Sequence, residues 1–491
     1  MSLINVEALS LGYGATPVFE NVGFSINAGD RLGLVGANGS GKSSLLKCLS
    51  ALCEDHGGSI TRKKSLKTYH VHQGLLAPSH GRETCTGFLS HYLADPGEEW
   101  KVSYTFELLA FPKQYRDLRI DELSGGWNKI LMFAAAIMSE PDLLIMDEPT
   151  NHLDMYRTEI LVNALRFAGH INTFVVASHD RYFLDAVTQQ TLFLDRQGTY
   201  RFPHAYTQAK VLMKEKQHAL ETEVLHKRSE VERLTESARF QRQLGVNNFS
   251  DKASQKAKQI EKKIRGLKNS LEARPAMAVG QIKLETESTE ARHLLKLRGF
   301  CVCAPSGELL FTIPELEVKR GDRIVVTGAN GSGKSTFLRA IAGLSGHAAQ
   351  LTPSARIGYF EQDSSQHPAA RSILDFVMEN AEPDASRAVA VLAQAGFDYS
   401  DAKKAMQRTS FGERARLSLL ALRLGRPNFL ILDEPTNHLD IRSQEMLEDE
   451  IQRTHAAALI VSHDRRFVEN VGTRFYSIKN GLLVEGAFHG E

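Results

Sequence analysis

Residues 36–43 read GANGSGKS, and residues 328–335 read the same eight letters. A second identity follows in the same order, because DEPTNHLD fills residues 147–154 and again residues 433–440. The two repeats have similar offsets, 328 − 36 = 292 and 433 − 147 = 286 residues. Ordered identities of this kind indicate that one domain is duplicated along the chain.

Each copy alternates short apolar runs with helix-like stretches. RLGLVG at 31–36 and RIVVTG at 323–328 lead into the glycine-rich loops, while LLIMDE at 143–148 and FLILDE at 429–434 end in carboxylates. Continuous apolar runs of this length are typical of parallel strands that are buried on both faces. We therefore expect two α/β domains that bind ligands at the carboxyl ends of their strands.

The length of 491 residues, 42% of them apolar, suits two such domains and a connector. We place the first domain at residues 1–206, the connector at 207–292 and the second domain at 293–491. Apolar residues recur at heptad spacing over 213–238 and again over 253–271, which predicts an α-helical coiled-coil hairpin. Its turn is expected between Leu244 and Ser250.

The glycine-rich loops have the composition of phosphate-binding loops, because bare backbone N–H groups at a helix N-terminus can approach phosphates closely. Lys42 and Lys334 are expected to neutralise the phosphates of ATP, while Ser43 and Ser335 offer hydroxyls to Mg²⁺. A mere glycine-rich turn is the alternative, and the duplication argues against it. The other loop residues expected to bind ATP are Gly36, Asn38, Gly39, Ser40, Gly41 and Ser44, with Gly328, Asn330, Gly331, Ser332, Gly333 and Thr336 in the second copy.

Carboxylates follow the next buried strand in each copy. Asp147 and Asp433 suit coordination of Mg²⁺ at a phosphoryl-transfer site. Glu148 and Glu434 come directly after them and can orient or deprotonate an attacking water, although paired acids can also simply cap a helix. The motif SHDR at 178–181 and 462–465 places His179 and His463 where each can contact a γ-phosphate; a purely structural histidine is the alternative.

With these motifs the chain resembles the ATP-binding cassette superfamily, and specifically the ABC-F family of tandem cassettes without transmembrane domains. The family's signature motif is identified as LSGGW at 123–127 and, in altered form, TSFGER at 409–414. The resemblance implies that the signature of one cassette covers the ATP bound to the other, so that the cassettes pair within one monomer. By the same resemblance the ATP-binding residues include Ser124, Gly125, Gly126, Ser410 and Gly412, with Tyr13 stacking on adenine; Gln73 and Gln362 are the metal-binding glutamines, and Asp154 and Asp440 the D-loop acids.

Several residues depart from the family pattern. Trp127 stands where Gln or Glu is usual, and Thr409 and Phe411 replace the usual Leu and first Gly. Pro305 occupies the place that corresponds to Tyr13. We therefore expect two unequal sites, with poorer hydrolysis where Lys42 is paired with the altered signature.

The connector carries the strongest charge asymmetry. The whole chain has a net charge of +1, but residues 239–268 hold nine basic against two acidic residues, 9 − 2 = +7. Such a tip suits a phosphate backbone, with a solvated spacer as the alternative. The ABC-F resemblance implies the ribosome, with its rRNA and tRNA, as the partner and leaves ribosome protection against antibiotics open. The residues expected to bind RNA are Arg239, Arg242, Lys252, Lys256, Lys258, Lys262, Lys263, Arg265 and Lys268.

The composition also limits the classes of protein to which the chain can belong. No apolar run reaches the ~18 residues that span a bilayer, and we expect neither a signal peptide nor membrane insertion. The five cysteines show no disulfide or zinc framework, which favours buried free thiols in a cytoplasmic protein. The main alternative function is the cytoplasmic tandem ATPase of a membrane importer. A DNA-maintenance ATPase fits less well, since its coiled coil would interrupt a single cassette.

Overall fold

The computed structural model describes most of the chain and divides it into two compact units. One unit holds Met1–Tyr206 and Gly280–Glu491, and the other is Thr207–Val279. The described residues are 2–13, 16–76, 80–93, 95–151, 153–167, 169, 171–195, 198–247, 255, 258–266, 291–343, 350–360, 372–380, 385–395, 397, 399–409, 411–437 and 439–486.

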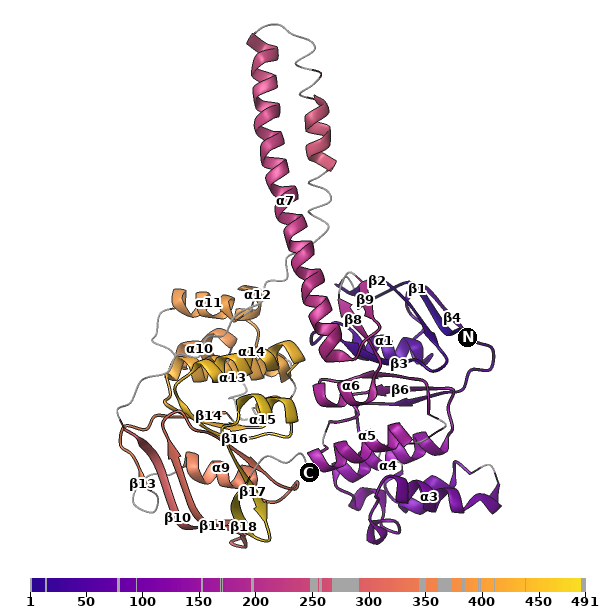
Figure 1. The fold of residues 1–491 in the computed structure, drawn as a ribbon, viewed down its shortest axis with the longest axis vertical. Helices are drawn as coiled ribbons and strands as arrows, with labels where there is room; N and C mark the ends of the chain where they lie inside the picture. Colours follow the sequence, from indigo (N-terminus) through magenta and orange to yellow (C-terminus); the bar gives the residue numbers. More distant parts are fainter. Residues whose placement is uncertain are drawn as a thin grey trace. The chain divides into compact units, whose positions relative to one another are not determined.

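The first cassette is built on a six-stranded sheet in the order β5-β6-β7-β3-β8-β9, next to a three-stranded antiparallel sheet in the order β2-β1-β4 (Figure 1). The first five strands of the larger sheet are parallel, and only β9 is antiparallel to its neighbour. The strands are β1 Ser2–Tyr13, β2 Thr16–Asn27, β3 Arg31–Val35, β4 Gly57–Arg62, β5 Thr68–Val71, β6 Leu143–Asp147, β7 Phe174–Ala177, β8 Gln190–Asp195 and β9 Gly198–Phe202.

The second cassette repeats this arrangement in one nine-stranded sheet, β13-β10-β11-β18-β17-β12-β16-β15-β14. Its parallel series β14-β15-β16-β12-β17 corresponds strand for strand to β5-β6-β7-β3-β8, so the duplicated α/β fold is confirmed. The strands are β10 His293–Cys303, β11 Leu309–Lys319, β12 Arg323–Thr327, β13 Gln350–Leu351, β14 Ile357–Phe360, β15 Phe429–Asp433, β16 Ala457–Val461, β17 Arg474–Lys479 and β18 Leu482–Gly486.

Helices carry the chain between the parallel strands. β6 and β15 are fully buried, as their continuous apolar sequences predict. The helices of the first cassette are α1 Lys42–Leu49, α2 Cys85–Ser90, α3 Trp100–Leu108, α4 Gly125–Met138, α5 Met155–Phe167 and α6 Arg181–Val187. Those of the second are α9 Lys334–Ala342, α10 Ile373–Asn380, α11 Ala385–Gln394, α12 Tyr399–Ala402, α13 Phe411–Gly425, α14 Ile441–Arg453 and α15 Arg465–Val471.

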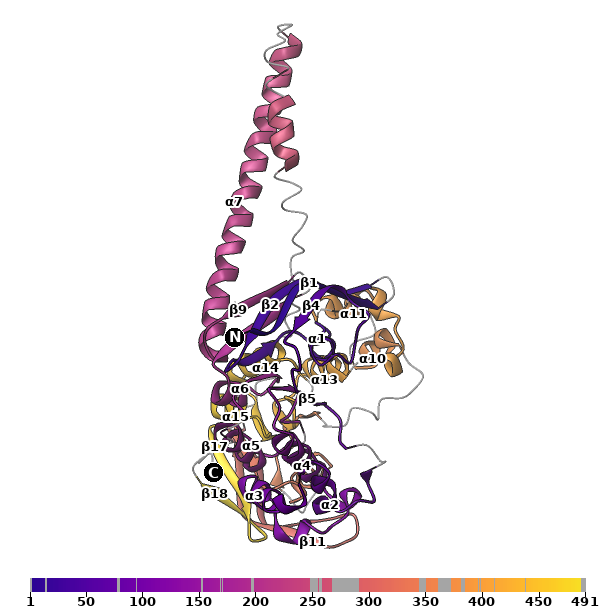
Figure 2. The same cartoon turned by 90° about the vertical axis from the view of Figure 1, so that its right-hand side faces the viewer.

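The second unit contains the long helix α7, Tyr206–Asn247, and a helical stretch at 258–266. The two run side by side in both views (Figures 1 and 2) and are joined by ion pairs Lys263–Glu230 at 2.8 Å and Arg242–Glu261 at 3.4 Å. Within α7, Val231 and Ala238 of the predicted seam are buried. The two helical stretches thus pack against each other, and the hairpin itself stays a prediction. Of the residues expected in its turn, 244–247 are still helical in α7, and 248–250 lie outside the described residues.

The cysteines correct another expectation. All five are free thiols, and Cys48 and Cys85 are buried as predicted. Cys301 and Cys303 are exposed instead. They alternate with the buried Val302 on β10, and side chains at i and i+2 of a strand share one face. No described helix is long and apolar enough to cross a membrane.

Candidate functional site

The glycine-rich loops connect β3 to α1 and β12 to α9. Gly41 and Gly333 precede the helices in the left-handed region, at φ 90° and 95°. A Cβ atom on Gly41 would lie 2.5 Å from Cγ1 of Val18, and one on Gly333 would lie 2.8 Å from Cδ1 of Leu310. Glycine is therefore required at both positions by backbone conformation and by close packing. Each loop places its backbone N–H groups at the N-terminus of the following helix, which is the arrangement that binds phosphate.

Each loop folds around its own lysine. The ammonium group of Lys42 donates to the carbonyls of Gly36 at 2.9 Å and Ala37 at 3.1 Å. Lys334 donates in the same way to Gly328 at 2.8 Å and to the next carbonyl at 2.9 Å. Burial lowers the pKa of both lysines, and nearby carboxylates oppose the shift. Both side chains are thus held at the loops, where added negative charge would stabilise the ammonium form.

Asp433 and Ser335 form a pair suited to a hard cation. The Ser335 hydroxyl donates to Oδ1 of Asp433 at 3.0 Å, while Oδ2 is buried with no hydrogen-bond partner among the described residues. Burial raises the pKa of Asp433 to about 6. A cation would offset this cost, and Mg²⁺ typically takes one or two carboxylates together with phosphate oxygens and waters. These residues therefore fit Mg²⁺ held jointly with a nucleotide.

The following glutamates have identical geometry in both cassettes. Glu148 and Glu434 both adopt φ 47°, a left-handed conformation that non-glycine residues rarely take. Glu148 accepts a hydrogen bond from the backbone N–H of His179 at 3.2 Å, and its Oε1 lies 3.4 Å from Nε2 of the same histidine. The corresponding distances from Glu434 to His463 are 3.1 and 3.4 Å. Burial raises the pKa of Glu148, which increases its proton affinity, as a general base requires.

The acids Asp154 and Asp440 each act electrostatically on the lysine of the opposite loop, and Asp440 also contacts that loop. The backbone N–H of Asn38 donates to Oδ2 of Asp440 at 3.0 Å, across the boundary between the cassettes. Asp440 also acts to raise the pKa of Lys42, and Asp154 acts in the same direction on Lys334. The relation between the cassettes is therefore reciprocal.

A single cavity of about 1520 Å³ lies where these elements meet. Pockets for one small ligand span roughly 300–1,000 Å³, so this space has room for more than one nucleotide. The residues expected in the site that line it are Asn38, Gly39, Gly41, Lys42, Ser43, Ser44, Gln73, Ser124, Gly125, Gly126, Asp147, Glu148, His179, Asn330, Gly331, Gly333, Lys334, Ser335, Thr336, Glu434 and His463.

Other expected residues lie elsewhere or outside the described part. Gly36, Ser40, Gly328, Ser332 and Asp433 belong to the same loops and strand but are not lining residues. Ser410, Gln362 and the side chain of Tyr13 lie outside the described residues, and Gly412 is placed only as part of the first turn of α13. The expected roles of these residues stay predictions.

The structure also shows residues with roles that sequence reasoning missed. Val18, Ala304 and Leu310 add an apolar part to the cavity wall. Lys129, one turn into α4, is 2% exposed and donates to the carbonyls of His72 and Gln73 at 2.6 and 3.0 Å. It thereby ties the signature helix to the loop that carries Gln73. Only its position after the signature motif could have pointed to it.

Trp127, noted above as a departure, has a defined structural place. Its ring packs against Phe111 and Tyr115 and lies 4.7 Å from the guanidinium carbon of Arg157. Arg157 in turn pairs with Oδ2 of Asp154 at 2.7 Å. Trp127 thus links the signature helix to the acid that faces the opposite loop.

The comparisons with known proteins agree with this geometry. The profile of the ABC transporter family matches residues 19–151 and 312–437. The ribosome protection protein VmlR of Bacillus subtilis is 30% identical over 94% of this chain and 84% of its own length. ABC transporter F family member 5 of Arabidopsis thaliana is 27% identical over 99% of this chain and 76% of its own.

The chain belongs to the ABC-F family of ATP-binding cassette proteins. As a tandem ABC protein it is an ATPase. A solved complex of the archaeal ribosome recycling factor aABCE1 has a TM-score of 0.63 and 17% identity, covering 96% of this chain and 87% of that one. At this identity the likeness concerns the fold alone, and it extends through both cassettes.

Proposed function

We propose that this ABC-F protein is a ribosome-associated translation ATPase of the cytoplasm. Its cassettes would close on two Mg-ATP molecules, present a basic helical hairpin to ribosomal RNA or tRNA, and release after hydrolysis. The observation that carries the ATPase cycle is the reciprocal arrangement of acids and glycine-rich loops, with the Asn38–Asp440 hydrogen bond as its direct contact. The ribosomal part rests on the charged connector and on the name of the related VmlR.

In this proposal each phosphate loop binds one ATP through its N–H groups and lysine. The residues that would hold Mg²⁺ are Ser43 and Asp147 in the first cassette and Ser335 and Asp433 in the second, with Gln73 and Gln362 as the remaining ligands. Mg²⁺, when bound, would neutralise charge on the phosphates. Glu148 and Glu434 would take a proton from the attacking water, while His179 and His463 would contact the γ-phosphates.

Closure follows from the way in which the sites are shared. A γ-phosphate held by the loop of one cassette would also receive the signature serine of the other, Ser124 or Ser410. Hydrolysis removes that shared group, so the free energy that favours closure is lost. ATP would therefore act between the cassettes as well as within each one.

The hairpin would supply the RNA contact. Among its described basic residues Arg239, Lys258, Lys262 and Arg265 are exposed. Arg242 and Lys263 are exposed too but already pair with glutamates, so they have less charge to offer to phosphates. Neutralisation of several phosphates makes binding strongly dependent on salt.

Co-sedimentation with ribosomes tests the proposal. The variant Glu148→Gln with Glu434→Gln should accumulate on ribosomes in the presence of Mg-ATP, because hydrolysis no longer releases it. Reversing Lys258, Lys262 and Arg265 to Glu should reduce co-sedimentation at least tenfold at moderate salt, with ATP binding by the free protein unchanged.

A matched control reverses Lys214, Arg228 and Arg233, which lie on the part of α7 where charges balance. The same change in net charge should have a much smaller effect there. Equal losses in the two triple variants would make the effect one of bulk charge, and retained co-sedimentation in the tip variant would reject the hairpin as the RNA contact. The importer alternative predicts no association with ribosomes in any variant.

A further inference from the structure

The arginine of the repeated SHDR motif has no role in the proposed phosphate chemistry, although it follows the histidine by only two residues. In both cassettes this arginine is buried, with Arg181 5% and Arg465 8% exposed. Burial of a guanidinium is costly unless it is paired. Its partners therefore indicate what the residue does.

The histidine and arginine of each motif are held in one rigid turn. The Ser178 hydroxyl accepts the backbone N–H of Asp180 at 3.1 Å, and the Asp180 carboxylate caps α6 through the N–H of Phe183 at 2.9 Å. The second cassette repeats both contacts, at 3.1 Å to Ser462 and 3.0 Å from Phe467. A displacement of His179 or His463 must therefore move the base of the neighbouring arginine.

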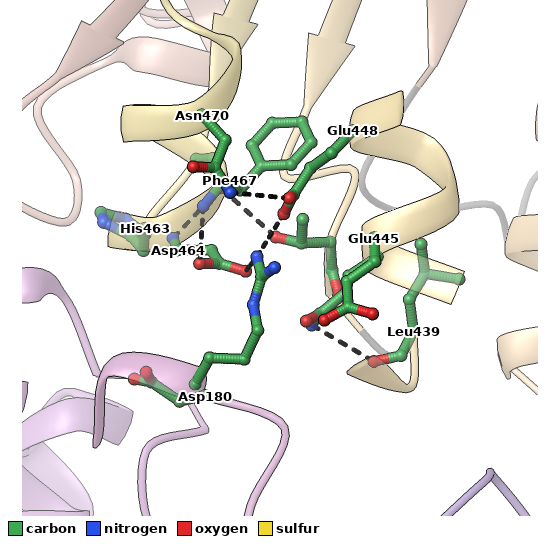
Figure 3. Close-up of polar contacts among 12 residues, drawn as sticks. Asp180, Leu439, Glu445, Glu448, His463, Asp464, Phe467 and Asn470 are labelled. Carbon is green, nitrogen blue, oxygen red and sulfur yellow. Dashed lines mark hydrogen bonds and ion pairs between the residues drawn. The ribbon is translucent and has the colours of Figure 1, made fainter. Parts of the chain in front are cut away.

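Arg181 reaches into the second cassette. Its guanidinium pairs with Glu448 on α14 and lies 3.3 Å from Oδ2 of Asp464, the residue directly after His463. Figure 3 shows Glu448 held from its other side by Asn470, a hydrogen bond of 2.9 Å. The side chains of Arg181, Glu448 and Asp464 are at most 10% exposed. A buried pair of this kind connects the two histidine turns directly.

Arg465 makes the reciprocal contact in the first cassette. It lies 3.2 Å from Oε2 of Glu159 on α5 and 4.4 Å from the centre of the Tyr182 ring. The Tyr182 hydroxyl donates to the same glutamate oxygen at 2.7 Å. Arg465 is paired more weakly than Arg181. Its partner Glu159 is 33% exposed, and two buried nitrogens of Arg465 have no hydrogen-bond partner among the described residues.

We propose that Arg181 and Arg465 are positioning residues that link the two γ-phosphate histidines across the cassette boundary, so that ATP in one site raises the affinity of the other. The inference rests on the proposed function in one respect, the contact of His179 and His463 with γ-phosphates. Each arginine has its base on one histidine turn and its charge in the opposite cassette. Through Asp464, Arg181 reaches the second histidine turn itself. Coupling between sites requires such an element whose position both sites bias.

Binding of mant-ATP with Mg²⁺ to the Glu148→Gln, Glu434→Gln protein measures this coupling without hydrolysis. The Kd of the Lys334 site is measured in that protein and in the same protein with Lys42→Ala, which should empty the first site. For coupled sites, we expect the Kd to be about fivefold or more higher in the Lys42→Ala protein, and this quotient is the affinity ratio. Arg181→Met should reduce the ratio to less than about twofold, and Arg465→Met should reduce it by a smaller factor.

Two controls separate coupling from general damage. Arg466→Met removes a more exposed pair to Asp185, 3.3 Å long, which also crosses the boundary but does not reach the opposite histidine turn. The affinity ratio should persist in this variant. Arg181→Met with Glu448→Leu removes the buried pair and leaves Asp464 as the remaining charge of the cluster, so stability should recover in part while coupling stays lost.

A ratio that survives in both Arg181 variants, or a protein with uncoupled sites from the start, overturns the inference. Failure of Lys42→Ala to remove a binding site would instead count against the proposed ATP sites themselves.

Discussion

The contact between Trp127 and Arg157 allows a quantitative prediction. Arg157→Met removes the guanidinium that pairs with Asp154 at 2.7 Å and lies 4.7 Å from the Trp127 ring. The N–H of Arg157 still donates to Asp154 at 2.9 Å, because that bond belongs to the backbone. The substitution therefore deletes one charged pair and one cation–π contact and leaves the start of α5 capped.

The magnitudes follow from burial. The side chains of Arg157 and Asp154 are 14% and 10% exposed, so their pair is largely desolvated. A hydrogen bond to a charged group contributes about 1.5–3 kcal/mol, and a desolvated cation–π contact about 1–2 kcal/mol. We expect Arg157→Met to lower the free energy of unfolding of the first cassette by roughly 2–4 kcal/mol. Arg157→Lys keeps the charge without the planar stack and should cost about half as much.

A double-mutant cycle with Trp127→Leu isolates the ring contact. Urea unfolding followed by circular dichroism gives the four free energies, and the expected coupling between the two positions is about 1 kcal/mol. Additivity within about 0.3 kcal/mol would refute the claim that the ring stabilises the guanidinium. Trp127 would then be a packing residue only, and its link to Asp154 would have no energetic basis.

Three further predictions concern other parts of the site. Ser124→Ala should slow phosphate release when only the Lys334 site can bind ATP, but not when only the Lys42 site can; a same-cassette effect would contradict the crosswise arrangement. Burial raises the pKa of Asp180 to about 6 from 3.8, so the folded state binds more protons between these values. Stability should therefore fall by about 2 kcal/mol relative to Asp180→Asn as pH rises from 4 to 6; a constant difference in urea unfolding would oppose this. Lys129→Met removes the hydrogen bonds from a buried ammonium group to the carbonyls of His72 and Gln73 and should lower the free energy of unfolding by about 2 kcal/mol, with an unchanged melting temperature as the contrary result.

The geometry of the glycine-rich loops could be predicted from sequence because it depends on local constraints. At the end of the first loop, only glycine fits at position 41, so the sequence itself shows this constraint. The parallel strands were predictable for a similar reason, since burial on both faces requires uninterrupted apolar runs.

Contacts between distant residues left no such pattern. Arg181 meets Glu448 across 267 positions, and no periodicity relates the two. Trp127 could be identified only as a departure from the family pattern, because its stabilising contact is made with Arg157 in the next helix. The helix α7 also continues through Leu244–Asn247, the first residues expected in the turn of the connector. One glycine costs about 1 kcal/mol inside a helix, too little to end one of 42 residues.

Asp440, expected as a D-loop acid, contacts the glycine-rich loop of the other cassette. Its Oδ1 accepts a hydrogen bond from the N–H of Ser443, and its Oδ2 accepts one from the N–H of Asn38 in the opposite loop. Asp154, its counterpart, accepts a hydrogen bond from Arg157 of its own cassette through Oδ2. The loop of Lys42 is therefore contacted directly by the second cassette.

In the proposed crosswise arrangement, the site of Lys42 also faces the altered signature, in which Phe411 stands where the family has glycine. We expect it to retain ATP and hydrolyse slowly, while the Lys334 site, facing the intact LSGG, carries turnover. Glu434→Gln should then cut steady-state phosphate release at least tenfold, and Glu148→Gln less than threefold, because each glutamate serves the site of its own cassette. Equal losses would mean that the signature substitution does not distinguish the sites, and a larger loss in Glu148→Gln would reverse the assignment.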